Sequence, residues 1–256
     1  MKEITVGTAR VPYRVLGAGR PVVLVHGGSR GSQGWDRVAA TLAETRMVVL
    51  PDLSGSDAAR DDGGELTVEL LAEQVAAVIT DLGPGPADLA GHSMGGAVVS
   101  SLAESRPDLV GSLVLVTAWT GRGDEYQRQA FSLWRDLARD ADAFARYTML
   151  MAFSRAYLES LDPAAVTEHA SAYQPVPGRL RQIDLASRLD VRDQLPRIQA
   201  PTLVIGCARD VLVPPEYSRA LTADIPHATY AEIDAAHNVM AEQPIEVAKL
   251  LRDFIA

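Results

Sequence analysis

A serine within residues 91–95, Gly-His-Ser-Met-Gly, stands where it could act as a nucleophile. An apolar, strand-like stretch from Pro86 to Ala90 precedes it, and a helix rich in small residues is predicted from Ala97 to Glu104. A serine between such a strand and helix takes a strained backbone conformation that requires neighbours without side chains. The flanking glycines provide that space, and the turn lifts the Ser93 hydroxyl clear of the backbone. The alternative is a tight turn whose serine only caps the helix.

A serine hydroxyl is a poor nucleophile at neutral pH, so it needs a base at hydrogen-bond distance, oriented by a third group. The sequence holds five histidines, of which His237 is the predicted base because it lies between the last predicted strand and the final helix. His26 and His92 flank the expected oxyanion region and are predicted to fix loops there. The His92 ring is expected to point away from the Ser93 hydroxyl.

The orienting group is expected to be a carboxylate at the end of another strand. Asp210 is the predicted orienter because it follows the apolar stretch 202–205. The alternative for this residue is a pairing with Arg209 or a cap on the next helix. Asp234 is the second choice for the orienter, ahead of two weaker candidates, Asp52 and Asp124.

An attack on a carbonyl also needs donors for the oxyanion that forms. The N–H of Met94 is the first predicted donor, because it belongs to the N-terminus of the helix after the serine. The second donor is expected from the loop after His26, where Gly28 permits close backbone approach and Ser29 is the fallback. Loss of one such donor typically lowers turnover by about 10²–10³.

Short apolar strands alternate with helical segments along most of the chain. This order indicates a mostly parallel sheet covered by helices on both faces, with ligands bound beyond the carboxyl ends of its strands. The strands are predicted over residues 4–6, 11–16, 21–25, 47–50, 86–90, 113–116, 202–205 and 230–233, and the helices over residues 35–43, 66–82, 97–104, 215–223 and 244–254.

Residues 119–196 interrupt this alternation, because their apolar residues recur only at helical spacing. We therefore expect a core of residues 1–118 and 197–256, with residues 119–196 inserted as a helical lid over the strand ends. The lid residues expected to bind substrate are Trp119, Trp134, Tyr147 and Met151. The alternative is that these side chains only pack the lid helices together. Because charged groups are few among them, an apolar acyl group is expected.

The composition describes a globular protein with a formal charge of −9, which argues against nucleic acid or anionic membranes as partners. One cysteine, Cys207, excludes an intrachain disulfide and a multi-cysteine metal site. The N-terminus has no signal-peptide pattern and no stretch is long enough to span a membrane, so a cytoplasmic location is expected. We expect a small-molecule substrate, no metal or organic cofactor, and a monomer or homodimer.

Four motifs occur in the order typical of the α/β-hydrolase superfamily, which the chain resembles over nearly its whole length. They are the loop 26–28, the turn 91–96, the segment 206–214 and the segment 237–244. The order of serine, aspartate and histidine is also that of this fold. Within the superfamily the chain is most similar to compact, lid-bearing esterases, lactonases and cofactor-free perhydrolases.

The sequence departs from the family pattern at two places, neither of which removes a reacting group. Ala236 stands where a glycine usually precedes the histidine, and residues 52–57 form a shortened version of a glycine-rich segment. The resemblance implies hydrolysis of a carboxylic ester, lactone or thioester through an acyl-enzyme at Ser93. Two alternatives are use of the same groups as a lyase, cyclase or C–C hydrolase, and a non-catalytic receptor that binds a small ligand under the lid.

Overall fold

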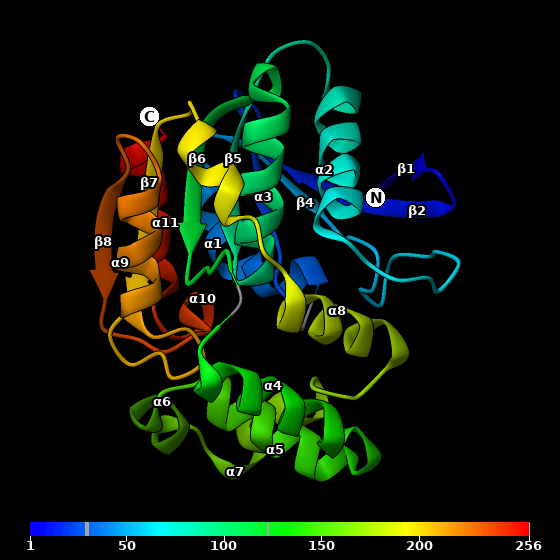
Figure 1. Cartoon of the computed structure of the whole chain (residues 1–256), viewed down its shortest axis with the longest axis vertical. Helices are drawn as coiled ribbons and strands as arrows, with labels where there is room; N and C mark the ends of the chain where they lie inside the picture. Colours follow the sequence, from blue (N-terminus) through cyan, green and yellow to red (C-terminus); the bar gives the residue numbers. More distant parts are fainter. Residues whose placement is uncertain (29–30, 122, 256) are drawn as a thin grey trace.

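An eight-stranded sheet forms the centre of the computed structural model, which describes residues 1–28, 31–121 and 123–255. The strand order is β1-β2-β4-β3-β5-β6-β7-β8 (Figure 1). The first two strands pair antiparallel with their neighbours, and the others run parallel. The strands are β1 (Lys2–Val6), β2 (Ala9–Leu16), β3 (Pro21–Val25), β4 (Met47–Pro51), β5 (Ala87–His92), β6 (Val110–Val116), β7 (Thr202–Cys207) and β8 (Thr229–Ile233).

The central strands are almost entirely buried and mostly apolar because both faces of the sheet are covered. Helices α1 (Asp36–Leu42) and α11 (Pro244–Phe254) pack on one face. Helices α2 (Val68–Leu82), α3 (Met94–Ser105) and α9 (Pro215–Asp224) pack on the other face. The short helix α10 (Val239–Glu242) follows the loop after β8. This arrangement confirms the predicted α/β-hydrolase fold class, a mostly parallel sheet flanked by helices.

The described residues between β6 and β7 form five α-helices, and Figure 1 shows them below the carboxyl ends of the strands. These inserted helices are α4 (Glu125–Asp136), α5 (Ala141–Ala152), α6 (Arg155–Ser160), α7 (Pro163–Ser171) and α8 (Pro177–Arg188). The helical spacing between residues 130 and 151 is broken at Asp140, whose side chain caps α5 by accepting from the Ala143 N–H. The described part of residues 119–196 is otherwise helix and loop.

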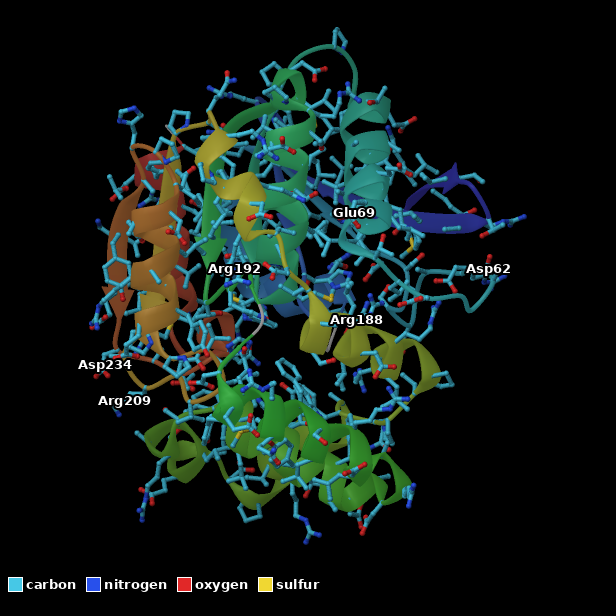
Figure 2. All side chains as sticks on the ribbon, in the orientation of Figure 1. Asp62, Glu69, Arg188, Arg192, Arg209 and Asp234 are labelled. Atoms are coloured by element: carbon cyan, nitrogen blue, oxygen red, sulfur yellow. The ribbon has the colours of Figure 1, made fainter. Side chains whose placement is uncertain are left out.

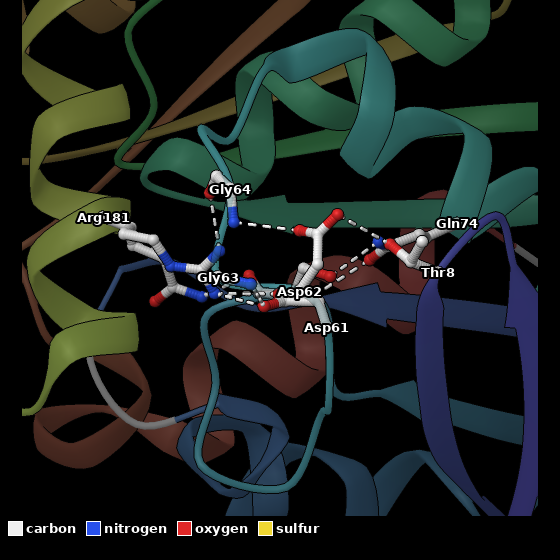
Figure 3. A network of polar contacts seen from close by, with 9 residues as sticks. Thr8, Asp61, Asp62, Gly63, Gly64, Gln74 and Arg181 are labelled. Atoms are coloured by element: carbon white, nitrogen blue, oxygen red, sulfur yellow. Dashed lines mark hydrogen bonds and ion pairs between the residues drawn. The ribbon is translucent and has the colours of Figure 1, made fainter.

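Helix α8 is tied to the loop that follows β4 (Figure 3). The Arg181 guanidinium donates to both carboxylate oxygens of Asp61 at 2.8 Å and to the carbonyl of Gly64 at 2.7 Å. Burial raises the pKa of Asp61, but the hydrogen bonds from Arg181, Gly63 and Ser54 together with the charge of Arg181 outweigh burial, so the pKa is lowered. A second cation, Arg188, donates to the Leu66 carbonyl at 2.5 Å. One face of α8 is thereby fixed to the core.

No helix in the described part of the chain is both long and apolar enough to cross a membrane.

Candidate active site

Ser93 occupies the sharp turn between β5 and α3, with φ of 56° and ψ of −126°. A β-carbon at Gly91 would lie 2.4 Å from the carbonyl oxygen of Gly95, and one at Gly95 would lie 2.5 Å from the carbonyl oxygen of His26. Both distances are too short for any side chain, so glycine is required on each side of the serine. The left-handed backbone at a non-glycine residue is strained, as is common where a reactive side chain is presented.

Three side chains from different segments form a line of hydrogen bonds. The Ser93 Oγ lies 2.9 Å from His237 Nε2, and His237 Nδ1 lies 2.8 Å from Asp210 Oδ2. The other carboxylate oxygen of Asp210 accepts from the N–H groups of Leu212 at 2.9 Å and Val213 at 2.8 Å. The serine, histidine and aspartate are each at most 6 % exposed. A carboxylate held this way keeps the histidine N–H at Nδ1 and leaves Nε2 free to take the serine proton.

The main chain of His237 is anchored to the strands beside the serine. His92 Nε2 donates to the His237 carbonyl at 3.0 Å, and Thr117 Oγ1 donates to the same oxygen at 3.4 Å. Burial, together with the nearby His237, lowers the pKa of His92 to about 3. His92 is therefore a neutral ring that links the nucleophile turn to the histidine loop. Burial also lowers the pKa of His26, whose Nε2 accepts from the Leu53 N–H at 3.0 Å and fixes that loop.

The other candidate carboxylates have different partners. Asp234 pairs with Arg209 at 2.5 Å, and both side chains lie on the surface (Figure 2). Asp52 accepts from the N–H and the hydroxyl of Ser32 at 2.8 and 2.9 Å. Asp124 caps the start of α4. The structure brings only Asp210, of these four, into contact with the histidine.

The two residues predicted as oxyanion donors both line the pocket that holds Ser93. The N–H of Met94 belongs to the first turn of α3, where a helix has no internal acceptor. Gly28 lines the same pocket as Ser93. A β-carbon at Gly27 would lie 2.9 Å from the Ser93 β-carbon, so this loop passes very close to Ser93. The fallback donor Ser29 lies outside the described residues.

A pocket above the serine holds about 570 Å³ of empty space, part of which opens to solvent. Outside the hydrogen-bonded triad its walls are almost entirely uncharged and mostly apolar. They consist of Gly28, His92, Met94, Trp119, Phe131, Trp134, Thr148, Met151, Ala152, Tyr173, Ile183, Ala186, Leu212 and Asn238.

Three of the four lid residues named from the sequence line this pocket, namely Trp119, Trp134 and Met151. Tyr147 does not contribute to the walls that the described residues form. Its ring packs edge-on against Trp134, 6.3 Å between centroids, and its hydroxyl donates to the Ala130 carbonyl at 2.9 Å. It supports the wall from behind.

Several lining residues were not identified from the sequence. Asn238 and Leu212 are neighbours of the histidine and the aspartate, and this adjacency is the signal that could have identified them. Tyr173 and Ile183 come from the inserted region, where helical spacing does not tell which face meets the pocket. Cys207 is buried, which raises the pKa of its thiol, and it is absent from the pocket walls.

A mostly parallel sheet that carries serine, aspartate and histidine in this order, with the serine on a sharp strand-to-helix turn, defines the α/β hydrolases. The chain belongs to this family, because residues 20–244 match the family described as alpha/beta hydrolase fold.

Individual relatives agree with this assignment. The chain is 36% identical over 260 residues to pyrrolizixenacetamide deacetylase of Xenorhabdus hominickii, covering 100% of this chain and 98% of that protein. A thermophilic esterase from Thermogutta terrifontis superposes with a TM-score of 0.86 at 25% identity, covering 100% of this chain and 98% of the other. The enol-lactonase from Burkholderia xenovorans has the same fold, with a TM-score of 0.89 at 23% identity over 99% of each chain. The protein is an enzyme of a hydrolase family.

Proposed function

We propose that the protein is a serine hydrolase that cleaves a carboxylic ester, lactone or thioester of an apolar small molecule through an acyl-enzyme at Ser93. The observation that carries the proposal is the unbroken line from Ser93 Oγ through His237 to Asp210, at 2.9 and 2.8 Å. A serine nucleophile, a base at its hydroxyl and a carboxylate that orients the base are the groups that acyl transfer requires.

Acylation begins when Ser93 Oγ attacks the substrate carbonyl and His237 Nε2 takes its proton. The carbonyl oxygen becomes an oxyanion, for which the N–H groups of Met94 and Gly28 are the proposed donors. Asp210 stabilises the imidazolium without taking its proton. The proton on Nε2 then passes to the leaving group, so the bond from carbon to the leaving atom breaks and an ester of Ser93 remains.

Deacylation repeats these steps with water. His237 Nε2 removes a proton from water, whose oxygen attacks the acyl-enzyme, and the same proton returns to Ser93 Oγ as the new acid departs. The uncharged walls around Trp119 and Trp134 favour an apolar acyl group.

An amide, in which the acyl group is bound to nitrogen, is a second candidate substrate. The relative from Xenorhabdus hominickii is named a deacetylase of an acetamide compound, and it is 36% identical to the whole chain. The proposed proton path suits a leaving amine as well as a leaving alcohol, because His237 protonates the leaving atom in both cases.

The test combines active-site labelling with turnover. A fluorophosphonate should form one adduct per chain, at Ser93, and 4-nitrophenyl esters of short and medium acyl chains should be hydrolysed. Ser93→Ala should abolish both while leaving the thermal unfolding midpoint unchanged. Retention of more than about a tenth of the ester turnover would refute the acyl-enzyme, because triad removals typically cost about 10⁴ or more.

Two other outcomes would favour the alternatives named from the sequence. Labelling of Ser93 without turnover of any ester, thioester or lactone would favour a lyase or C–C hydrolase. An unlabelled serine in a protein that binds a small ligand tightly would favour a receptor.

A further inference from the structure

Asn238, the residue after the proposed base, is held rigidly at the pocket wall. Its backbone N–H donates to the carbonyl of Ala152 on α5 at 2.8 Å, and its carbonyl accepts from the N–H of Ala241 at 2.9 Å. These contacts come from opposite sides, one from the inserted helices and one from α10. They fix the direction in which the side chain leaves the backbone.

Only the nitrogen of the Asn238 carboxamide has a hydrogen-bond partner among the described residues. Its Nδ2 donates to the hydroxyl of Tyr173 at 3.2 Å, and Tyr173 is 1% exposed. Its Oδ1 has no hydrogen-bond partner among the residues that the structure describes. Asn238 lines the pocket that holds Ser93 and His237, and this partly exposed side chain has one acceptor without a partner among the described residues.

Two other polar side chains in this wall already use their donor groups. Thr148 Oγ1 accepts from Trp134 Nε1 and donates to the Phe144 carbonyl, both at 2.8 Å. His92 donates its Nε2–H to the His237 carbonyl. A substrate N–H entering this apolar pocket therefore meets Asn238 Oδ1 as a neutral acceptor that is not committed elsewhere.

An ester and an amide differ at this point. After attack by the serine, the nitrogen of an amide becomes pyramidal and turns its lone pair toward the base that will protonate it. Its N–H then points to another wall of the pocket and needs an acceptor, whereas an ester oxygen carries no such hydrogen. A buried donor left without a partner typically costs about 1–3 kcal/mol.

We propose that Asn238 is a specificity-determining residue that admits secondary amides, which are acylated primary amines, or N–H carbamates, with an apolar acyl group. The proposal rests on the proposed serine hydrolase function. Ser93 Oγ bonds to the carbonyl carbon, its proton passes through His237 Nε2 to the nitrogen, and the C–N bond breaks to release the amine. Asn238 Oδ1 accepts a hydrogen bond from the remaining N–H throughout and takes no proton.

A second, polar groove also reaches Asn238 and suits the departing amine. Asn238 also lines this groove, together with Gln33, Arg37 and Glu168. An amine becomes a cation in neutral water, and the groove offers it a polar surface that the aromatic wall of the catalytic pocket does not. The apolar acyl part would thus lie in the catalytic pocket and the polar amine in the groove, both of which Asn238 lines.

The experiment compares 4-nitrophenyl acetate with 4-nitroacetanilide, which share an acyl group and a nitroaryl leaving group but differ in the leaving atom. For Asn238→Ala we expect the ratio of amide to ester kcat/KM to fall by about tenfold. Asn238→Asp keeps an acceptor at the same place and should restore most of that ratio. The N-methyl anilide lacks the N–H, so the wild type should discriminate against it and Asn238→Ala should lose this discrimination.

An unchanged amide-to-ester ratio in Asn238→Ala would overturn the proposal, since a residue that only positions His237 would slow both substrates equally. Turnover of the ester with no turnover of the amide by the wild type would overturn it as well, and would leave the serine hydrolase function standing. If Ser93 is neither labelled by a fluorophosphonate nor active on the ester, the underlying function fails first. Thermal unfolding of each variant separates these results from a loss of folding.

Discussion

Replacing Asp210 with asparagine should change which nitrogen of His237 carries the proton. In the wild type Asp210 Oδ2 can only accept, so the histidine N–H faces it across 2.8 Å and Nε2 stays free for the Ser93 hydroxyl. In Asp210→Asn the oxygen that accepts from Leu212 and Val213 is expected to stay in place, because two N–H groups hold it. The new amide nitrogen must then face His237, and it is a donor.

Two donors cannot share one hydrogen bond, so the ring is driven to the tautomer with its hydrogen on Nε2. That nitrogen can no longer take the serine proton. A carboxamide in place of the triad carboxylate lowers kcat by about 10⁴, which corresponds to about 5 kcal/mol of transition-state stabilisation. The fold should be retained, because the two backbone hydrogen bonds to residue 210 remain.

The assay is single-turnover and steady-state hydrolysis of 4-nitrophenyl acetate, with the urea unfolding midpoint measured alongside. Asp234→Asn is the matched control: its ion pair with Arg209 is exposed, and such pairs contribute about 0–1 kcal/mol. Its kcat should stay within about twofold of the wild type. If kcat falls by less than tenfold in Asp210→Asn, or by more than tenfold in Asp234→Asn, the assignment of Asp210 as the orienting carboxylate is refuted.

Other perturbations follow from the same geometry. The pKa of His92 is about 3 in the folded protein, whereas its ordinary value is 6.5. As the pH falls, His92 is therefore protonated in the unfolded chain before it is protonated in the folded protein. The free energy of unfolding should therefore drop below about pH 6.5, by about 2 kcal/mol at pH 5, and His92→Gln should remove this part of the drop in urea titrations. Arg181→Met should lower the free energy of unfolding by about 1–3 kcal/mol, because it leaves the mostly buried Asp61 carboxylate without its cation. Adding Asp61→Asn should recover part of that loss in a double-mutant cycle.

The placement of Ser93, Asp210 and His237 beside one another could be predicted from the sequence because it follows from topology. Apolar strands that alternate with helices define a parallel sheet, and Ser93, Asp210 and His237 follow strands whose carboxyl ends share one edge. The role of Gly91 and Gly95 could also be predicted from the sequence, because the turn leaves no space for a β-carbon at either position. The start of α3 was misplaced by three residues, because no local signal separates the turn from the helix that begins at Met94.

The pocket walls could be predicted only in part. Trp134 and Tyr147 occur at similar helical spacing, yet one faces the pocket and the other packs behind it, because that choice depends on how the inserted helices are rotated against the sheet. Part of that rotation is set by the contact of Arg181 with Asp61, 120 positions apart in the chain. Nor does any local pattern reveal that Asn238 Oδ1 has no hydrogen-bond partner among the described residues.

The attachment of α8 to the loop after β4 bears on how such enzymes can be recombined. The walls of the pocket come largely from one continuous segment, which suggests that exchanging residues 119–196 between relatives would transplant a substrate preference. Arg181, however, is bonded to Asp61 and Gly64, which such an exchange would leave behind. A chimaera of this chain should therefore carry its own residues 54–66 along with the inserted helices, and the smallest transferable unit of specificity is discontinuous in the sequence.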